Sequence, residues 1–229
     1  MHLLLTDRLT CPRCGPEHGL ILLAREIVNR RVLDGEVGCS NCREHFPIVG
    51  GFADLRWPRV EETPGPADAP STPTPAADTE LAVKVAALLG LTDGAGFILL
   101  AGRATDAADA LSEMLAGDEW IAVGEHLRSQ TERAGVSRLA ASQDHVPLTT
   151  GGLRGAALDA NHAEWLPEVT RALAPGARVA VFDPPGDVAE RASALGLEVV
   201  LDAPEALVAA RGPNLVPLRR SPAKGSFGA

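Results

Sequence analysis

The four cysteines of the chain are its clearest chemical signal, and they form two pairs with identical spacing. The pairs are Cys11-Pro-Arg-Cys14 and Cys39-Ser-Asn-Cys42. Two residues between thiols make a tight turn that directs both sulfur atoms at one ion, and two such turns complete a tetrahedral site of four cysteines. Two disulfides or a redox-active pair are the alternatives, and both fit poorly with an intracellular chain and a doubled spacing. The spacing therefore predicts a zinc ion.

A closed site of four thiolates leaves no open position for a substrate, so the zinc is expected to be structural. The cysteines lie in a module of residues 1–57, and a module of this size has a small core that needs such a metal. His18 and His45 lie near the cysteine pairs. With four thiols available, both histidines are expected to be surface residues rather than ligands.

A second stretch with chemical meaning is FILLAGRATDAAD, residues 97–109. An apolar run reaches a glycine and then turns into a helix-like segment, as in enzymes that bind nucleotide-like cofactors. Such turns carry two or three glycines. Here Gly102 stands alone, followed by Arg103, Ala104, Thr105 and Asp106.

The elements that position these residues follow from composition and periodicity. Residues 58–79 contain six prolines and few large apolar residues, which predicts an extended linker. Residues 80–218 alternate strand-like and helix-like runs, which favours a parallel sheet covered on both faces. Residues 219–229 are expected to be a disordered tail. The expected strands are 97–102, 119–125, 137–142, 155–160, 177–183, 198–203 and 206–211, and the expected helices are 80–90, 104–117, 127–136, 163–176 and 187–197.

Composition and charge narrow the function classes. Of 229 residues, 45% are hydrophobic, so the chain can build one sizeable domain and a small one. Residues 1–59 hold eight Lys/Arg against seven Asp/Glu, about +1, so the remaining residues carry -10 of the formal net charge of -9. That acidic remainder is a poor platform for polyphosphate. Neither a membrane-spanning run nor a signal peptide is recognisable, and a cytoplasmic location is expected.

Residues 3–56 resemble a known family of zinc ribbons. The stretches LLLTDRLTCPRCG and VGCSNCREHFPIVGGFADL are similar to bacterial short zinc-ribbon proteins. They also look like the zinc-ribbon partners that activate tRNA, rRNA and release-factor methyltransferases in eukaryotes and archaea. The run Phe46-Pro47-Ile48 and the glycine turn that follows are part of this pattern. The resemblance implies that the ribbon performs no chemistry and binds and stabilises a methyltransferase.

Residues 80–211 resemble the class I S-adenosylmethionine-dependent methyltransferase fold over their whole length. The resemblance lies in the order and spacing of five features in residues 142–185. These are Asp144, Val146-Pro147-Leu148, the strand to Asp159, Leu173-Ala174-Pro175-Gly176, and the strand from Val179 to Pro184. It implies an α/β chain in which a small four-cysteine zinc ribbon precedes a Rossmann-like sheet with helices on both faces.

The same resemblance implies that Gly102 lets the backbone approach the methionine part of the cofactor at the start of a helix. Ala104 and Asp106 occupy the later glycine positions. If the Asp106 carboxylate lies near the methionine carboxylate, repulsion between the two negative charges would weaken cofactor binding by on the order of 3 kcal/mol at an effective dielectric near 20. That is roughly a hundredfold in affinity, unless Arg103 offsets it. Asp106 can instead be a helix cap that points away.

Two further acids complete the implied cofactor site. Glu125, after the second strand, is placed to accept the ribose hydroxyls, and Asp144 is placed near the adenine amino group. His162 is a candidate general base, because an unperturbed histidine titrates near neutral pH; a plain surface role is the alternative. Asp183-Pro184-Pro185 resembles the Asn-Pro-Pro-aromatic motif of RNA base and glutamine methyltransferases. It follows the fifth strand instead of the fourth, so it is interpreted as a strand-ending turn.

These observations favour a ribbon fused to a divergent methyltransferase-like domain with a degenerate cofactor site, acting as a binding or regulatory module. Its partner would be another protein or an RNA–protein assembly. The alternative is an active S-adenosylmethionine-dependent methyltransferase with a built-in activator ribbon. In a third interpretation the ribbon contacts RNA directly, through Arg8, Arg13, Arg30, Arg31 and Arg43. A solvated face is the ordinary interpretation of such scattered arginines.

Overall fold

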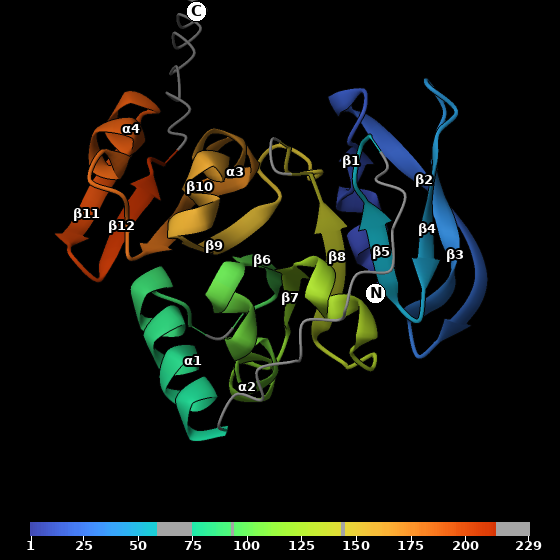
Figure 1. Cartoon of the computed structure of the whole chain (residues 1–229), viewed down its shortest axis with the longest axis horizontal. Coiled ribbons are helices and arrows are strands. Elements are labelled where there is room, and N and C mark those ends of the chain that lie inside the picture. The colour runs from blue at the N-terminus through green and yellow to red at the C-terminus, as the bar shows by residue number, and fades with distance from the viewer. Residues whose placement is uncertain (59–74, 93, 143–144, 214–229) are drawn as a thin grey trace, which may run out of the picture.

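The structure is a computed structural model, and it describes residues 1–58, 75–92, 94–142 and 145–213. The N-terminal part, residues 1–57, is called the ribbon below (Figure 1). Its elements are the 3-10 helix η1 (Leu3–Arg8) and the strands β1 (Thr10–Cys11), β2 (Gly15–Val28), β3 (Arg31–Cys39), β4 (His45–Val49) and β5 (Phe52–Leu55). The residues between the two cysteine pairs form a β-hairpin.

The second part alternates strands with helical segments, as the apolar periodicity predicts. Its strands are β6 (Gly96–Ala101), β7 (Asp118–Val123), β8 (Val136–Ala141), β9 (Leu153–Asp159), β10 (Leu173–Phe182), β11 (Leu197–Ala203) and β12 (Ala206–Arg211). Its α-helices are α1 (Pro75–Leu89), α2 (Ala108–Met114), α3 (Leu166–Ala172) and α4 (Val188–Ala194). The 3-10 helices η2 (Gly102–Ala107), η3 (Glu125–Ser129) and η4 (Ala160–Trp165) follow β6, β7 and β9.

The strands of the second part follow the order β8-β7-β6-β9-β10-β12-β11. Strands β6 to β10 are parallel, and β12 pairs antiparallel with β10 and with β11. The chain starts in the middle, winds outward to β8, and then returns to the other side of β6. This is the doubly wound arrangement, in which the strand order reverses beside the first strand.

Helices cover both faces of this sheet, which confirms the predicted fold class. Residues that alternate along the strands feed two separate cores. Ile98, Leu100 and Trp120 pack with α1 and α2 on one face. Leu99 and Ile121 pack with α3 and α4 on the other. Trp120 is fully buried.

The ribbon docks on its own second part and extends the same sheet. Strand β5 pairs in parallel with β8, from Phe52 opposite Arg138 to Leu55 opposite Ala141. The result is a twelve-stranded sheet that runs from β1 to β11. Leu5 and Phe46 of the ribbon belong to the core that α3 and α4 cover.

A buried ion-pair network lies at this junction. The guanidinium of Arg31 on β3 bonds Glu119 of β7 at 2.6 Å and Glu132 at 2.5 Å. It also donates to the carbonyl of Val136. Arg31 is only 7% exposed, so it cannot be part of an RNA-binding surface, and the expectation that it contacts RNA is wrong.

Some expected elements differ in extent. Residues 127–136 were expected to be helical, but only Glu125–Ser129 form a 3-10 helix. This segment lacks an apolar stripe, and Arg138 binds the carbonyls of Leu127 and Gln130. Leu173 to Gly176 open β10 instead of ending a helix.

The expected linker and tail are largely outside the described residues. Helix α1 begins at Pro75, inside the stretch expected as linker. Residues 59–74 and the tail at 219–229 are not described. Among the described residues, no helix combines the length and apolar character needed to cross a bilayer.

Candidate functional site

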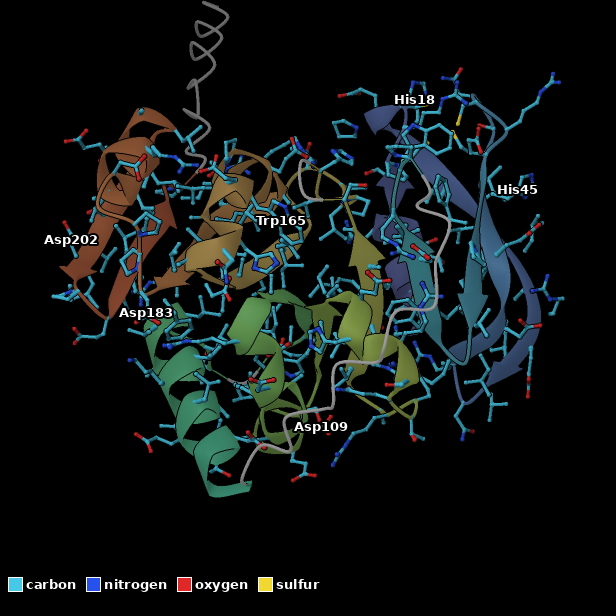
Figure 2. All side chains as sticks on the ribbon, viewed as in Figure 1. His18, His45, Asp109, Trp165, Asp183 and Asp202 are labelled. Carbon is cyan, nitrogen blue, oxygen red and sulfur yellow. The ribbon has the colours of Figure 1, made fainter. Side chains whose placement is uncertain are left out.

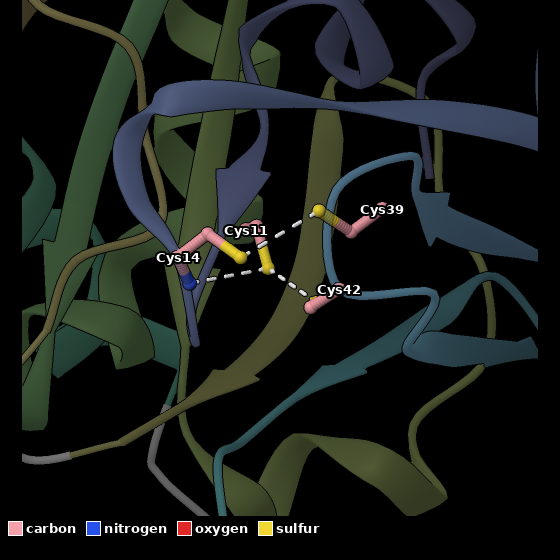
Figure 3. Close-up of side chains that lie close together, drawn as sticks. All are labelled: Cys11, Cys14, Cys39 and Cys42. Atoms are coloured by element: carbon pink, nitrogen blue, oxygen red, sulfur yellow. Dashed lines mark hydrogen bonds between the residues drawn. The ribbon is translucent and has the colours of Figure 1, made fainter.

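The four cysteine sulfur atoms converge from two turns of the ribbon (Figure 3). One turn joins β1 to β2 and the other follows β3. All four sulfurs lie within 4.8 Å of one another. Cys11 and Cys42 are 3.6 Å apart, and Cys39 and Cys14 are 3.9 Å apart, Sγ to Sγ. All four cysteines are free thiols. Four sulfurs placed tetrahedrally at about 2.3 Å from zinc are separated by roughly 3.8 Å.

The surroundings of the sulfurs suit a cation. The backbone N–H of Cys14 donates to Cys11 Sγ, and the side-chain amide of Asn41 donates to Cys14 Sγ, both at 3.4 Å. Burial raises the pKa of the Cys11 thiol to about 12. For Cys39, backbone N–H groups of Cys42 and Asn41 outweigh burial and lower the pKa to about 7. A divalent metal would displace the remaining thiol protons.

Neither nearby histidine joins this cluster. The candidate metal-binding group in the described chain consists of the four cysteines alone. His18 lies on β2 and His45 on β4, on the outer part of the ribbon (Figure 2). His45 Nδ1 is 3.0 Å from a carboxylate oxygen of Glu36.

Four of the expected cofactor residues lie at the carboxyl edge of the sheet, where strands β6 and β7 end: Gly102, Ala104, Asp106 and Glu125. Doubly wound folds bind ligands in the crevice beside the strand at which the order reverses, here between β6 and β9. Gly102 directly follows β6 and has a φ of 63°. Asp159 ends β9 next to it.

The Asp159 carboxylate fills the space beside Gly102. It accepts hydrogen bonds from the backbone N–H of Arg103 at 3.2 Å and of His162 at 3.2 Å. A Cβ atom at residue 102 would overlap this carboxylate. Burial alone would raise the pKa of Asp159, but the hydrogen bonds from His162 and Arg103 outweigh it and lower the pKa. The glycine is thus needed to admit a side chain of the protein itself.

The other residues of the turn do not point to an open pocket. Ala104 is fully buried against the core under α1 and α2. Asp106 is exposed on η2. The pKa of Asp106 is raised, chiefly by partial burial. The charge of Asp78 adds to this effect, and that of His126 opposes it. The carboxylate against Gly102 is therefore that of Asp159, to which the sequence analysis assigned no cofactor contact.

Glu125, the candidate ribose acceptor, is held by the ribbon. Its carboxylate lies 2.9 Å from a guanidinium nitrogen of Arg56, which directly follows β5. Arg56 also binds Asp54 at 2.6 Å, and Arg128 binds the same carboxylate at 2.7 Å. Burial raises the pKa of Asp54, but the two arginines outweigh it and lower the pKa. The ribbon thus supplies charged groups to the carboxyl edge.

Asp144, the candidate adenine acceptor, lies outside the described residues. His162 is oriented by Asp159: its Nδ1 lies 2.6 Å from Asp159 Oδ1. The imidazole packs edge-on against Trp165, whose side chain lies in the interior (Figure 2). A histidine held at Nδ1 by a carboxylate has the geometry of a general base with Nε2 as the reactive atom.

Arg103 contacts residues at the end of β10. Its guanidinium pairs with Asp183 at 2.6 Å and lies 4.9 Å from the centre of the Phe182 ring. Asp183 has a φ of 47° where β10 ends, as expected for a strand-ending turn. Arg56 was not singled out from the sequence, and Asp159 was named there only as the end of a strand. The signal available for Asp159 is its position before a helix start, which is typical of an N-cap.

No family model matches the chain. No curated protein matches it either. Several solved structures are similar to it. A SAM-dependent methyltransferase from Aquifex aeolicus has 17% identity and a TM-score of 0.46 over 60% of this chain and 97% of that one. A complex of the Haloferax volcanii Trm112 methyltransferase activator with a candidate methyltransferase has 14% identity and a TM-score of 0.45 over 62% of this chain and 92% of that one.

The cyclase SpnF is also similar, with 16% identity and a TM-score of 0.44 over 54% of this chain. This chain spans 58% of the length of SpnF. These likenesses concern the fold and do not identify an activity. The fold assignment here rests on the strand order and on the helices that cover both faces of the sheet.

Proposed function

We propose that the chain is a zinc ribbon fused to a methyltransferase-like domain with a degenerate S-adenosylmethionine site, acting as a binding or regulatory module. The observation that carries this proposal is the Asp159 carboxylate against Gly102. A cofactor would have to displace this partly buried carboxylate from the backbone N–H groups of Arg103 and His162. It would also bring its own carboxylate close to a negative charge.

The charges along the edge support the same conclusion. Asp159 is paired with His162, Glu125 with Arg56, and Asp183 with Arg103. Each of these three acids already has a partner within the protein. Polar groups that satisfy one another gain little from a ligand, because binding must first break the existing bonds.

The cysteine cluster supports a structural zinc ion in this proposal. Cys11, Cys14, Cys39 and Cys42 would hold it with no open position, so it would stabilise the ribbon without taking part in chemistry. Since β5 is already engaged with β8, this edge of the ribbon is not free to activate a second methyltransferase. A partner, another protein or an RNA–protein assembly, would bind elsewhere on the molecule.

The test is calorimetric titration of the zinc-loaded protein with S-adenosylmethionine and with S-adenosylhomocysteine. We expect no binding up to about 1 mM, an affinity at the weak end of the usual range. An Asp159→Ser variant should bind at least about tenfold more tightly than the native protein if Asp159 is the obstacle. Asp183→Ser, which removes a carboxylate from the same edge, is the matched control and should leave binding unchanged.

The second candidate is an active methyltransferase with a built-in activator ribbon. It is favoured by the left-handed Gly102 after β6 and by Glu125 after β7, both at the edge where this fold binds ligands. Micromolar binding to the native protein would overturn the degenerate-site proposal in favour of this candidate. If neither the native protein nor Asp159→Ser binds, the obstacle lies in other residues of the turn, such as Asp106.

A further inference from the structure

A cavity of about 690 Å³ opens at the opposite, amino-terminal edge of the sheet. It lies where β6, β7 and β9 begin, and η1 of the ribbon contributes to its lining. The described part of the crossover from β8 to β9 contains no helix. The six-residue η1 packs against this face instead, with Leu9 bridged to Leu148. A short helix cannot fill the place of a full crossover helix, so a hollow remains.

Glycines and apolar side chains make up much of the lining of this cavity. Gly96, Gly117, Gly135 and Gly152 line it, each beside the start of a strand. Around them lie the side chains of Leu4, Phe97, Leu153 and Ala174. The volume falls in the range of roughly 300–1,000 Å³ that is typical of small-molecule sites, which are mostly apolar with a few directed polar groups.

The acids that line the cavity are already neutralised. Both oxygens of Asp118 accept from Arg154 Nη1, at 2.8 and 2.9 Å. Glu119 accepts from Arg31 at 2.6 Å and from the Ser137 hydroxyl at 2.5 Å. Neither carboxylate therefore attracts a cationic ligand.

Two donors remain for a ligand. Arg8 lines the cavity, and no side-chain partner for its guanidinium occurs among the described residues. His2 Nδ1 accepts from the backbone N–H of Leu4 at 3.2 Å, so a neutral ring carries its proton on Nε2. Burial lowers the pKa of His2, which favours that neutral ring. Within the described residues, no partner for Nε2–H is found.

We propose that this cavity binds a small amphipathic carboxylate. The carboxylate would accept hydrogen bonds from the Arg8 guanidinium and His2 Nε2–H, while an alkyl or aryl group would contact Phe97, Leu153 and Leu4. A guanidinium pairs with a carboxylate by two parallel, charge-assisted hydrogen bonds, which give direction as well as affinity. The proposal does not depend on the cofactor site, which lies at the other edge of the sheet.

The experiment uses 4-phenylbutyrate and its neutral isostere 4-phenylbutyramide, followed by saturation-transfer NMR and calorimetry on the full, zinc-loaded chain. We expect the acid to bind with a dissociation constant of about 0.1–1 mM, as befits a ligand of this size. The amide should bind at least roughly tenfold more weakly, because it cannot form the charge-assisted pair.

Three variants test the assignment. Arg8→Met keeps the length of the side chain and removes its charge, and it should weaken the acid roughly tenfold. Leu4→Glu places a negative charge at the exposed rim of the cavity, where it would repel the carboxylate of the ligand. It should also weaken the binding of the acid roughly tenfold. Arg25→Met, which removes an exposed arginine of the ribbon outside this cavity, should change nothing. Zinc content and melting temperature establish that each variant is folded.

Three results would overturn the proposal. The first is equal binding of the amide and the acid. The second is undiminished binding of the acid to Arg8→Met. The third is the absence of saturation transfer to the native protein with the acid at about 10 mM, well above the expected dissociation constant.

Discussion

The cysteine cluster and the carboxyl edge of the sheet both gather side chains that can hold a ligand, but they differ in how those side chains are satisfied. At the cluster, four groups of one kind converge, and the hydrogen bonds found for them come from N–H groups and from other thiols. At the edge, acids and bases alternate and pair with one another. Like groups that converge need a counter-charge from outside, whereas opposite groups supply their own.

The largest expected effect is the loss of one cysteine. Cys39 is buried, and Cys39→Ser would leave three thiols for the metal. Structural zinc contributes about 10–16 kcal/mol to the folding of isolated fingers, so we expect the ribbon to lose its fold. Zinc stoichiometry by mass spectrometry and the thermal unfolding curve are the measurements.

Ser40→Ala lies in the same turn on an exposed residue and serves as the control for Cys39→Ser. It should retain one zinc per chain. A Cys39→Ser protein that still binds one zinc and melts like the native chain would show that the cluster is not a metal site, and the contrast between the two regions would disappear.

The next effect concerns the ion-pair network at the junction between the ribbon and the second part of the chain. Arg31→Met would remove the cation that Glu119 and Glu132 share. Glu132 keeps its pairs with the Met1 ammonium and Arg138. The buried Glu119, by contrast, would keep the Ser137 hydroxyl but no cation. Removing one partner of a buried pair costs about 3–5 kcal/mol, because the remaining charge is uncompensated. Urea unfolding should show this loss of unfolding free energy.

Arg25→Met is the matched control for Arg31→Met. Its pair with Asp34 is solvent-exposed, so the change should be small. Equal stabilities of the two variants would contradict the view that Arg31 fastens the ribbon to the sheet.

The cysteine spacing was sufficient to predict that the four sulfur atoms gather at one point, because two residues between thiols fix the geometry of each pair locally. Short, nearly continuous apolar runs predicted each strand of the second part, since strands that are buried on both faces are apolar on both. The contact of Asp159 with Gly102 was not predictable in this way. It joins residues 57 positions apart through the pairing of β6 with β9. Arg56 with Glu125 is likewise a product of β5 joining β8, which no local pattern encodes.

A smaller effect is expected from Asp159→Asn at the carboxyl edge. Hydrogen bonds to a charged group contribute about 1.5–3 kcal/mol, so the variant should be less stable by about this amount at pH 7. The folded pKa of Asp159 lies below its ordinary value. Its stabilising contribution is therefore present above about pH 4, the unfolded pKa, and is lost as pH falls through the folded pKa.

The measurement for Asp159→Asn is the unfolding free energy of both proteins as a function of pH. The difference between native protein and variant should shrink as the pH falls below about 4. A difference that stays constant with pH would mean that the charge of Asp159 contributes nothing, and the edge could then open to a ligand at little cost.

The smallest expected effect concerns the pair between Arg56 and Glu125. Glu125 is more than half exposed, and exposed pairs contribute about 0.2–1 kcal/mol. A double-mutant cycle with Arg56→Ala and Glu125→Ala isolates this pair from the bond between Arg56 and Asp54. A coupling within that range leaves Glu125 free to exchange Arg56 for a ribose at low cost, so the barrier to the cofactor would rest on Asp159. A coupling well above it would make the ribbon itself part of the barrier, because Arg56 reaches the edge only through the pairing of β5 with β8.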